Sequence, residues 1–181
     1  MVYMFLANGF EEVEALAPLD LLRRAGVEVT TVGIGGDSIT GSHGITVKAD
    51  VKDKKVKFDE LEMVILPGGM PGTKNLDASE TVHRALDIAK ERNAFIAAIC
   101  AAPMILGKRG DLKGLDAVCY PGFEEYLEGA KLHERSVTVI SAGKTITARG
   151  MGVAVEFGLA LVSALCGEEK AAELSHAIIN D

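Results

Sequence analysis

Short apolar runs that alternate with helical patterns are the feature that most constrains the fold of this chain. The pattern predicts strands at residues 2–7, 27–34, 63–66, 95–99, 115–119, 137–140 and 145–147, a hairpin within residues 38–51, and helices at residues 11–25, 79–92, 152–165 and 168–179. Strands separated by helices predict βαβ units, and these build a mostly parallel sheet with helices on both faces. We therefore predict an α/β sandwich, and 181 residues suit a single domain, residues 1–181.

The composition argues against several classes of protein. A formal net charge of −7 without a cluster of lysines and arginines argues against nucleic-acid binding. The apolar runs are too short to span a bilayer, and the N-terminal segment turns acidic after ten residues, so we expect neither a membrane span nor a secretory signal. Three cysteines without CxxC spacing indicate reduced thiols in the cytoplasm, and four isolated histidines predict no metal site. We expect no cofactor.

Cys100 stands where the predicted strand 95–99 meets a predicted helix that has Pro103 in its first turn. A thiol at such a turn faces backbone N–H groups and the positive end of a helix dipole, which favour the thiolate. Ala98 and Ala102 provide the small neighbours that a sharp nucleophile turn requires. The alternative is a buried structural cysteine, the role we expect for Cys119 and Cys166.

Two further segments follow predicted strands and fall at the same sheet edge, where α/β folds bind ligands. In one, the N–H groups of Gly68 and Gly69, together with that of Ala101, could form an oxyanion hole for a carbonyl attacked by Cys100. The alternative is a flexible loop.

The other segment places three carboxylates at the start of a helix, listed in order as Glu11, Glu12 and Glu14. We expect at least two of them on a solvated face, where they complement the helix dipole. A buried carboxyl group beside the thiol would instead stay protonated and donate a hydrogen bond to sulfur. The pattern does not select which of the three plays this part.

Five segments together resemble the ThiJ/PfpI superfamily, in the branch that includes the parkinsonism-associated deglycase. They are Gly9–Glu14, Asp20–Gly26, Leu66–Gly69, Ala97–Pro103 and Thr147–Gly152 with Glu156 and Phe157. The resemblance implies a flavodoxin-like three-layer sandwich, a homodimer and an oxidation-prone nucleophile at Cys100. It also implies that Glu14 is the partner carboxylate, and that Arg149 and Gly150 lie near the same pocket.

Activities credited to the family include glutathione-independent glyoxalase chemistry, deglycation, redox-regulated chaperone action and, in another branch, proteolysis. The protease branch has a histidine directly after the nucleophile, and Ala101 at that position argues against proteolysis. Deglycase relatives place a histidine where this chain has Tyr120, so we expect slow carbonyl turnover. We therefore predict a cysteine-dependent enzyme that acts on small reactive aldehydes or glycated groups. The alternative is a non-enzymatic sensor or chaperone in which Cys100 is oxidised to sulfinate.

Overall fold

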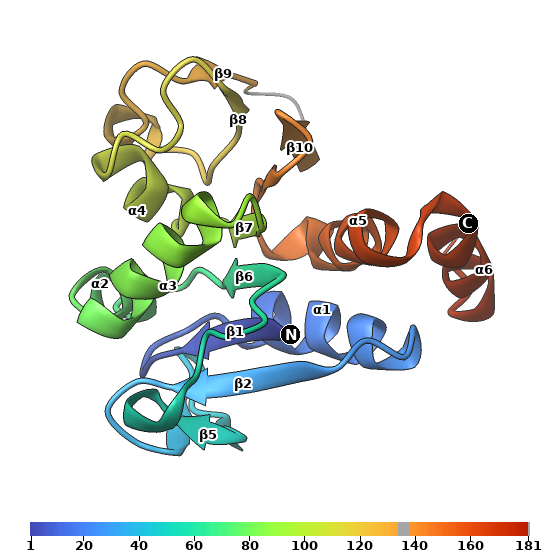
Figure 1. Ribbon diagram of the computed structural model, residues 1–181, viewed down its shortest axis with the longest axis horizontal. Coiled ribbons are helices and arrows are strands. Elements are labelled where there is room, and N and C mark those ends of the chain that lie inside the picture. The colour runs from blue at the N-terminus through green and yellow to red at the C-terminus, as the bar shows by residue number, and fades with distance from the viewer. Residues whose placement is uncertain (134–137, 181) are drawn as a thin grey trace.

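The structure is a computed structural model that describes residues 1–133 and 138–180. Its centre is a seven-stranded sheet in the order β10-β11-β7-β6-β1-β2-β5 (Figure 1). The strands are β1 (Val2–Leu6), β2 (Val29–Gly33), β5 (Val51–Lys52), β6 (Met63–Leu66), β7 (Phe95–Ile99), β10 (Thr138–Ser141) and β11 (Thr145–Ala148). All neighbouring strands pair in parallel except β10 and β11, which are antiparallel. The predicted mostly parallel α/β sandwich is confirmed.

Helices cover both faces of this sheet (Figure 1). They are α1 (Glu12–Arg24), α2 (Gly72–Asp77), α3 (Glu80–Glu91), α4 (Pro103–Lys108), α5 (Ala154–Cys166) and α6 (Glu168–Ala177). Successive strand residues face opposite sides, so Val64 packs with α3 and α4 on one face, whereas Ile65 packs with α1 and α5 on the other. Within the described residues, no helix is long and apolar enough to cross a membrane.

Local signals in the sequence set several of these boundaries. Gly26 follows α1 with a φ of 82°, a conformation that glycine adopts without a steric penalty. The Ser79 side chain accepts a hydrogen bond from the N–H of Val82 and caps α3. Pro103 occupies the first position of α4, where its missing N–H leaves no bond unmade.

Two small sheets lie outside the main one. β3 (Ser38–Thr40) and β4 (Thr46–Lys48) form the predicted hairpin. The strand predicted at residues 115–119 is shorter, because only β8 (Asp116–Ala117) forms, and it pairs with β9 (Lys131–Leu132) instead of joining the main sheet. Residue 137, the first of another predicted strand, lies outside the described residues.

The sheet register brings the candidate site together. Leu66 at the end of β6 pairs with Ala98 near the end of β7, and β1 pairs with the other side of β6. The carboxyl ends of these three parallel strands therefore lie at one sheet edge, where the loops that follow them meet.

Candidate active site

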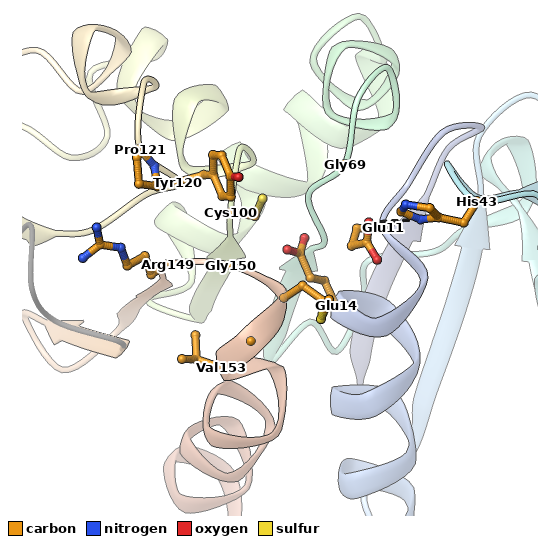
Figure 2. A pocket seen from close by; sticks show the side chains of 12 residues that line it. Glu11, Glu14, His43, Gly69, Cys100, Tyr120, Pro121, Arg149, Gly150 and Val153 are labelled. Carbon is orange, nitrogen blue, oxygen red and sulfur yellow. Dashed lines mark ion pairs between the residues drawn. The ribbon is translucent and has the colours of Figure 1, made fainter.

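Cys100 lies directly after β7 and is held in an unusual backbone conformation. Its φ is 64°, in the left-handed region that non-glycine residues rarely enter, and its N–H donates to the Ala148 carbonyl at 2.9 Å. Its own carbonyl accepts from the N–H of Tyr120 at 2.8 Å. These bonds to two other segments fix the turn, and Figure 2 shows the sulfur facing the space between Tyr120 and Glu14.

Glu14 enters the site from the first turn of α1 and is only 1% exposed. Its Oε2 accepts a hydrogen bond from the N–H of Gly68 at 3.0 Å. Its Oε1 is buried and has no hydrogen-bond partner of ordinary geometry among the described residues. Glu14 therefore has few donors for a buried charge, which favours the protonated acid.

The titration of the two groups follows from this geometry. Burial raises the pKa of Glu14 to about 7, although contacts with Cys100 and the Gly68 N–H lower it; the charge of Glu11 raises it further. Burial and the charge and hydrogen bond of Glu14 raise the pKa of Cys100 to about 12, against the lowering effect of the Gly69 and Ala101 N–H groups. The prediction that the Cys100 thiol ionises easily is therefore wrong for a thiol beside ionised Glu14. The sequence predicted a helix start after Cys100, which favours the thiolate. It did not predict the burial of Cys100 and Glu14, which raises the pKa of both groups.

The coupled pair still offers a reactive thiolate. When the pair has lost one proton, the remaining proton can reside on sulfur or on Glu14. The form with protonated Glu14 and thiolate is a minor one, yet thiolate is the nucleophile. Its fraction rises until Glu14 titrates near pH 7 and then levels off, because further base does not change the number of protons on the pair.

The two glycines of the loop after β6, Gly68 and Gly69, were both predicted to form the oxyanion hole, but they have different roles in the structure. The N–H of Gly69 and that of Ala101 face Cys100, as an oxyanion hole requires. The N–H of Gly68 is used by Glu14 instead, so the prediction that it joins the oxyanion hole is wrong. A Cβ on Gly68 would lie 2.6 Å from both Glu14 Oε2 and the Cys100 Cβ, so only glycine fits there.

A cavity of about 670 Å³ opens above this pair (Figure 2). It is lined by Glu11, Glu14, His43, Gly69, Cys100, Tyr120, Pro121, Arg149, Gly150, Met151, Gly152 and Val153. Most of the sequence-predicted site residues therefore lie together, whereas Gly68 and Ala101 lie behind the lining. Figure 2 shows the Arg149 guanidinium pointing away from Cys100. The volume lies within the range of small-molecule pockets.

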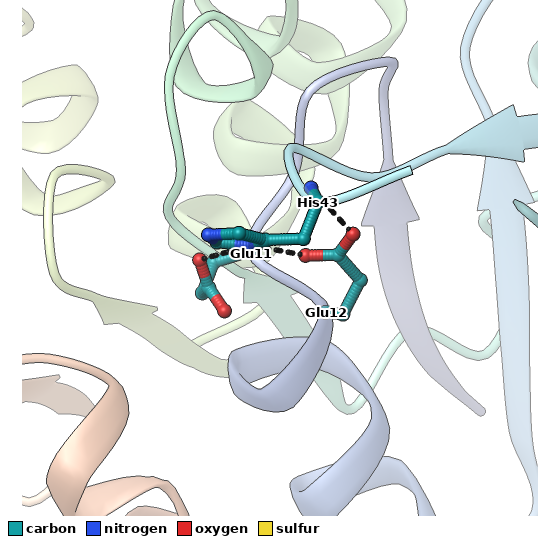
Figure 3. Close-up of side chains that lie close together, drawn as sticks. All are labelled: Glu11, Glu12 and His43. Carbon is teal, nitrogen blue, oxygen red and sulfur yellow. Dashed lines mark hydrogen bonds and ion pairs between the residues drawn. The ribbon is translucent and has the colours of Figure 1, made fainter. Parts of the chain in front are cut away.

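The other two carboxylates bind the tip of the β3–β4 hairpin (Figure 3). Glu12 is 3% exposed, and its carboxylate accepts from the His43 backbone N–H at 2.7 Å and lies 3.0 Å from His43 Nδ1. Glu11 Oε2 lies 3.4 Å from the same ring nitrogen. The expectation that two of the three carboxylates are solvated is wrong, because Glu12 and Glu14 are both buried. No sequence pattern placed His43 in the site; it lies 31 residues after Glu12 in the chain and joins the site through the turn between β3 and β4.

Opposite pKa changes accompany this contact. Burial alone would raise the pKa of Glu12, but hydrogen bonds from His43 and from the backbone N–H groups lower it to about 2. The hydrogen bond to Glu12, followed by the charges of Glu11 and Glu12, raises the pKa of His43. Ligand atoms of these three residues lie within 4.8 Å of one another. Because the Glu12 oxygens already accept hydrogen bonds from the hairpin, we interpret the cluster as an ion-pair cluster.

The other two cysteines, Cys119 and Cys166, do not line the cavity. Cys119 is buried, and burial, with the charge of Glu124, raises its pKa to about 11 despite the opposing charge of Arg149. Cys166 was expected to be buried, but it is exposed at the end of α5. Within the described residues, Cys100 is therefore the cysteine that combines partial burial, a strained turn and a protonated acid.

Comparisons with known proteins show the family of this chain. Residues 1–164 match the DJ-1/PfpI family. The chain belongs to this family. Protein dj-1beta of Drosophila melanogaster is 35% identical over 177 residues, covering 97% of this chain and 95% of that protein. Its crystal structure matches with a TM-score of 0.94 at 33% identity, covering 99% of this chain and 97% of the other.

Two further relatives bear on chemistry. A deglycase of Pyrococcus horikoshii is 33% identical over 156 residues, covering 82% of this chain and 90% of that protein. A Toxoplasma gondii DJ-1 structure, described as oxidized, matches with a TM-score of 0.93 at 33% identity, covering 98% of this chain and 97% of the other. The DJ-1/PfpI fold predicted from the motifs is thus confirmed, and the family includes a protein named for deglycase activity.

Proposed function

We propose that this protein converts small reactive carbonyl compounds through a covalent adduct on Cys100, with Glu14 as the proton-transfer group. The observation that carries the proposal is the buried Glu14 carboxyl, whose pKa of about 7 lets it give and take protons near neutral pH beside the sulfur. A general acid–base group works best when its pKa lies near the working pH.

For a 2-oxoaldehyde such as methylglyoxal, the Cys100 sulfur bonds to the aldehyde carbon, and the aldehyde oxygen gains a proton from Glu14. The product is a hemithioacetal. The Glu14 carboxylate then removes the hydrogen of that carbon and delivers a proton to the neighbouring carbon, while the hydroxyl proton of the hemithioacetal passes to the ketone oxygen. The aldehyde carbon thereby becomes a thioester, and the ketone becomes a hydroxyl group. Water cleaves the thioester, which releases a 2-hydroxy acid and regenerates the thiol. The Gly69 and Ala101 N–H groups stabilise the negative oxygen during addition and hydrolysis.

Lactate formation from methylglyoxal tests this proposal. We expect the parent to form lactate, Cys100→Ser to form none, and Glu14→Gln to lose at least the roughly 100-fold that a positioned acid or base contributes. Cys166→Ser is the matched control, because it removes an exposed thiol far along α5, and it is expected to keep the parent rate. A parent without lactate formation, or an active Cys100→Ser variant, would contradict the proposal.

A second candidate function is sensing of peroxide through Cys100. The likeness to a DJ-1 structure described as oxidized favours it, and the N–H groups of Gly69 and Ala101 can donate to oxygen atoms on the sulfur. Two peroxide molecules would oxidise the thiolate through sulfenate to sulfinate and be reduced to water. Mass spectrometry after mild peroxide treatment is expected to show two added oxygen atoms on Cys100. Together with an inert parent in the lactate assay, this result would favour sensing over catalysis.

A further inference from the structure

We propose that the Glu11–His43 ion pair, which the buried carboxylate of Glu12 holds in place, sets the protonation of Glu14 and thereby the pH range in which Cys100 is reactive. The inference rests on the proposed partnership of Glu14 and Cys100 and assigns Glu11, Glu12 and His43 as positioning residues. None of the three needs to touch a substrate for this effect.

Glu11 is held in a fixed position by backbone contacts. Its backbone N–H donates to the Gly68 carbonyl at 2.9 Å, while the Gly68 N–H donates to Glu14 at 3.0 Å. A Cβ on Gly69 would lie 2.3 Å from the Glu11 nitrogen, so the β6 loop and the start of α1 are in direct backbone contact. Glu11 and Glu14 are three residues apart and line the same cavity, so the charge of Glu11 opposes ionisation of Glu14.

His43 neutralises the charge of Glu11 when its imidazole is protonated. The ring Nδ1 lies 3.4 Å from Glu11 Oε2, and the Ser42 hydroxyl lies 3.3 Å from the same oxygen. When His43 is protonated, its charge reduces the field of Glu11 at Glu14. When His43 loses its proton, Glu11 opposes the ionisation of Glu14 at full strength, so Glu14 keeps its proton to a higher pH.

Glu12 anchors the hairpin turn that carries His43. Its carboxylate receives the backbone N–H of His43 at 2.7 Å and that of Ile45 at 3.4 Å, in addition to the imidazole. A Cβ on Gly41 would lie 2.4 Å from the Glu12 carboxyl, so glycine at this position of the hairpin leaves room for that side chain. Glu12 therefore holds the hairpin tip and places the imidazole ring beside Glu11 (Figure 3).

Other charged and titratable groups face this wall, and the test has to account for them. Tyr120 and Arg149 lie on the opposite side of the cavity, and Cys100 lies at its base beside Glu14 (Figure 2). They are unchanged in every variant below, so differences between variants report the Glu11–His43 pair.

The measurement is the pH dependence of Cys100 alkylation by iodoacetamide, followed by mass spectrometry at that site. Its midpoint follows the titration of Glu14, because the reactive form has one proton fewer than the fully protonated pair. We expect Glu11→Gln to lower this midpoint by roughly half to one pH unit, the size of an interaction between charges one helical turn apart in partly screened surroundings. Glu169→Gln, an exposed residue on α6, is the control with the same change in net charge.

Removing the positive charge of His43 should shift the alkylation midpoint in the opposite direction. His43→Gln is expected to raise the midpoint, and His43→Lys, which keeps a positive charge at every pH used, is expected to keep it at or below the parent value. The shift caused by Glu11→Gln should shrink in 1 M salt, because the pair is partly exposed. In Glu12→Gln, an NMR titration of His43 should show a lower pKa than in the parent.

Three results would overturn the inference: an unchanged or higher midpoint in Glu11→Gln, an equal shift in Glu169→Gln, or a fall of the midpoint in His43→Gln. These results are independent of carbonyl turnover. A parent that forms no lactate but shows the stated midpoint shifts refutes the proposed function and leaves the inference standing, and the reverse pattern refutes the inference alone.

Discussion

Replacing Glu14 by glutamine should stabilise the protein at high pH. Glutamine has the shape of the protonated acid and retains an oxygen that can accept from the Gly68 N–H, but it never carries a charge. In the parent, the pKa of Glu14 is about 7 in the folded state and its ordinary value is 4.5. Between pH 4.5 and about pH 7, Glu14 is therefore protonated in the folded state and ionised in the unfolded chain.

The sign and size of the effect follow from this difference. A raised folded pKa contributes stability that is fully present below pH 4.5 and is lost as pH rises to about 7. At about 1.4 kcal/mol for each pH unit, the gap corresponds to about 3 kcal/mol of unfolding free energy. We expect Glu14→Gln to match the parent near pH 4 and to exceed it at pH 8 by up to this amount.

Urea denaturation of both proteins at pH 4, 6 and 8 measures the difference, because groups common to both cancel at each pH. Glu12→Gln is a control of opposite sign: the pKa of Glu12 is lowered to about 2, so its stabilising contribution is present above pH 4.5 and is lost as pH falls through the folded value. A stability difference between Glu14→Gln and the parent that stays constant from pH 4 to pH 8, or a parent that is the more stable protein at pH 8, would refute the reasoning.

Four further predictions concern the site and its surroundings. Gly68→Ala should cost about 1–3 kcal/mol of stability, measured by denaturation, and slow Cys100 alkylation, because its Cβ would press on Glu14 and Cys100. Tyr120→His should raise lactate formation, by up to the roughly 100- to 10,000-fold of a positioned base, whereas Tyr120→Phe should leave it nearly unchanged. Cys166 should be alkylated at the rate of an exposed thiol, as measured by mass spectrometry. Light scattering at micromolar concentration should show a homodimer, and a monomer would contradict the expected assembly.

The architecture could be predicted because the signals that specify it are local. The strand at 95–99, the N-cap at Ser79 and the proline at the start of α4 each act within a few residues, and the structure has all three. The predictions failed where formation depends on distant partners. The run 115–119 contributes only two residues to a small separate sheet, because its partner β9 is equally short.

In the candidate site, too, local features could be predicted from the sequence and features that depend on distant contacts could not. The turn at Cys100 was visible in the sequence, because an apolar strand ends beside small residues and a proline. The choice among Glu11, Glu12 and Glu14 was not, because it depends on Gly68 and on a hairpin tip brought to α1 by the fold. The resemblance to a family supplied Glu14 where pattern reasoning left three candidates open.

The two buried carboxylates of α1 show how a fold can give neighbouring acids opposite properties. Glu12 and Glu14 are two residues apart and only 3% and 1% exposed, yet the pKa of one is about 2 and that of the other, which burial raises, is about 7. Glu12 receives two backbone N–H groups and an imidazole, whereas Glu14 receives one N–H and contacts a thiol. A cost of about 3 kcal/mol at neutral pH and above is a large part of the 5–15 kcal/mol that ordinarily separates folded from unfolded chains. Groups that destabilise the folded state are commonly found where a reaction requires them. The Glu14→Gln substitution should therefore stabilise the protein and at the same time remove proton transfer to a carbonyl compound bound at Cys100.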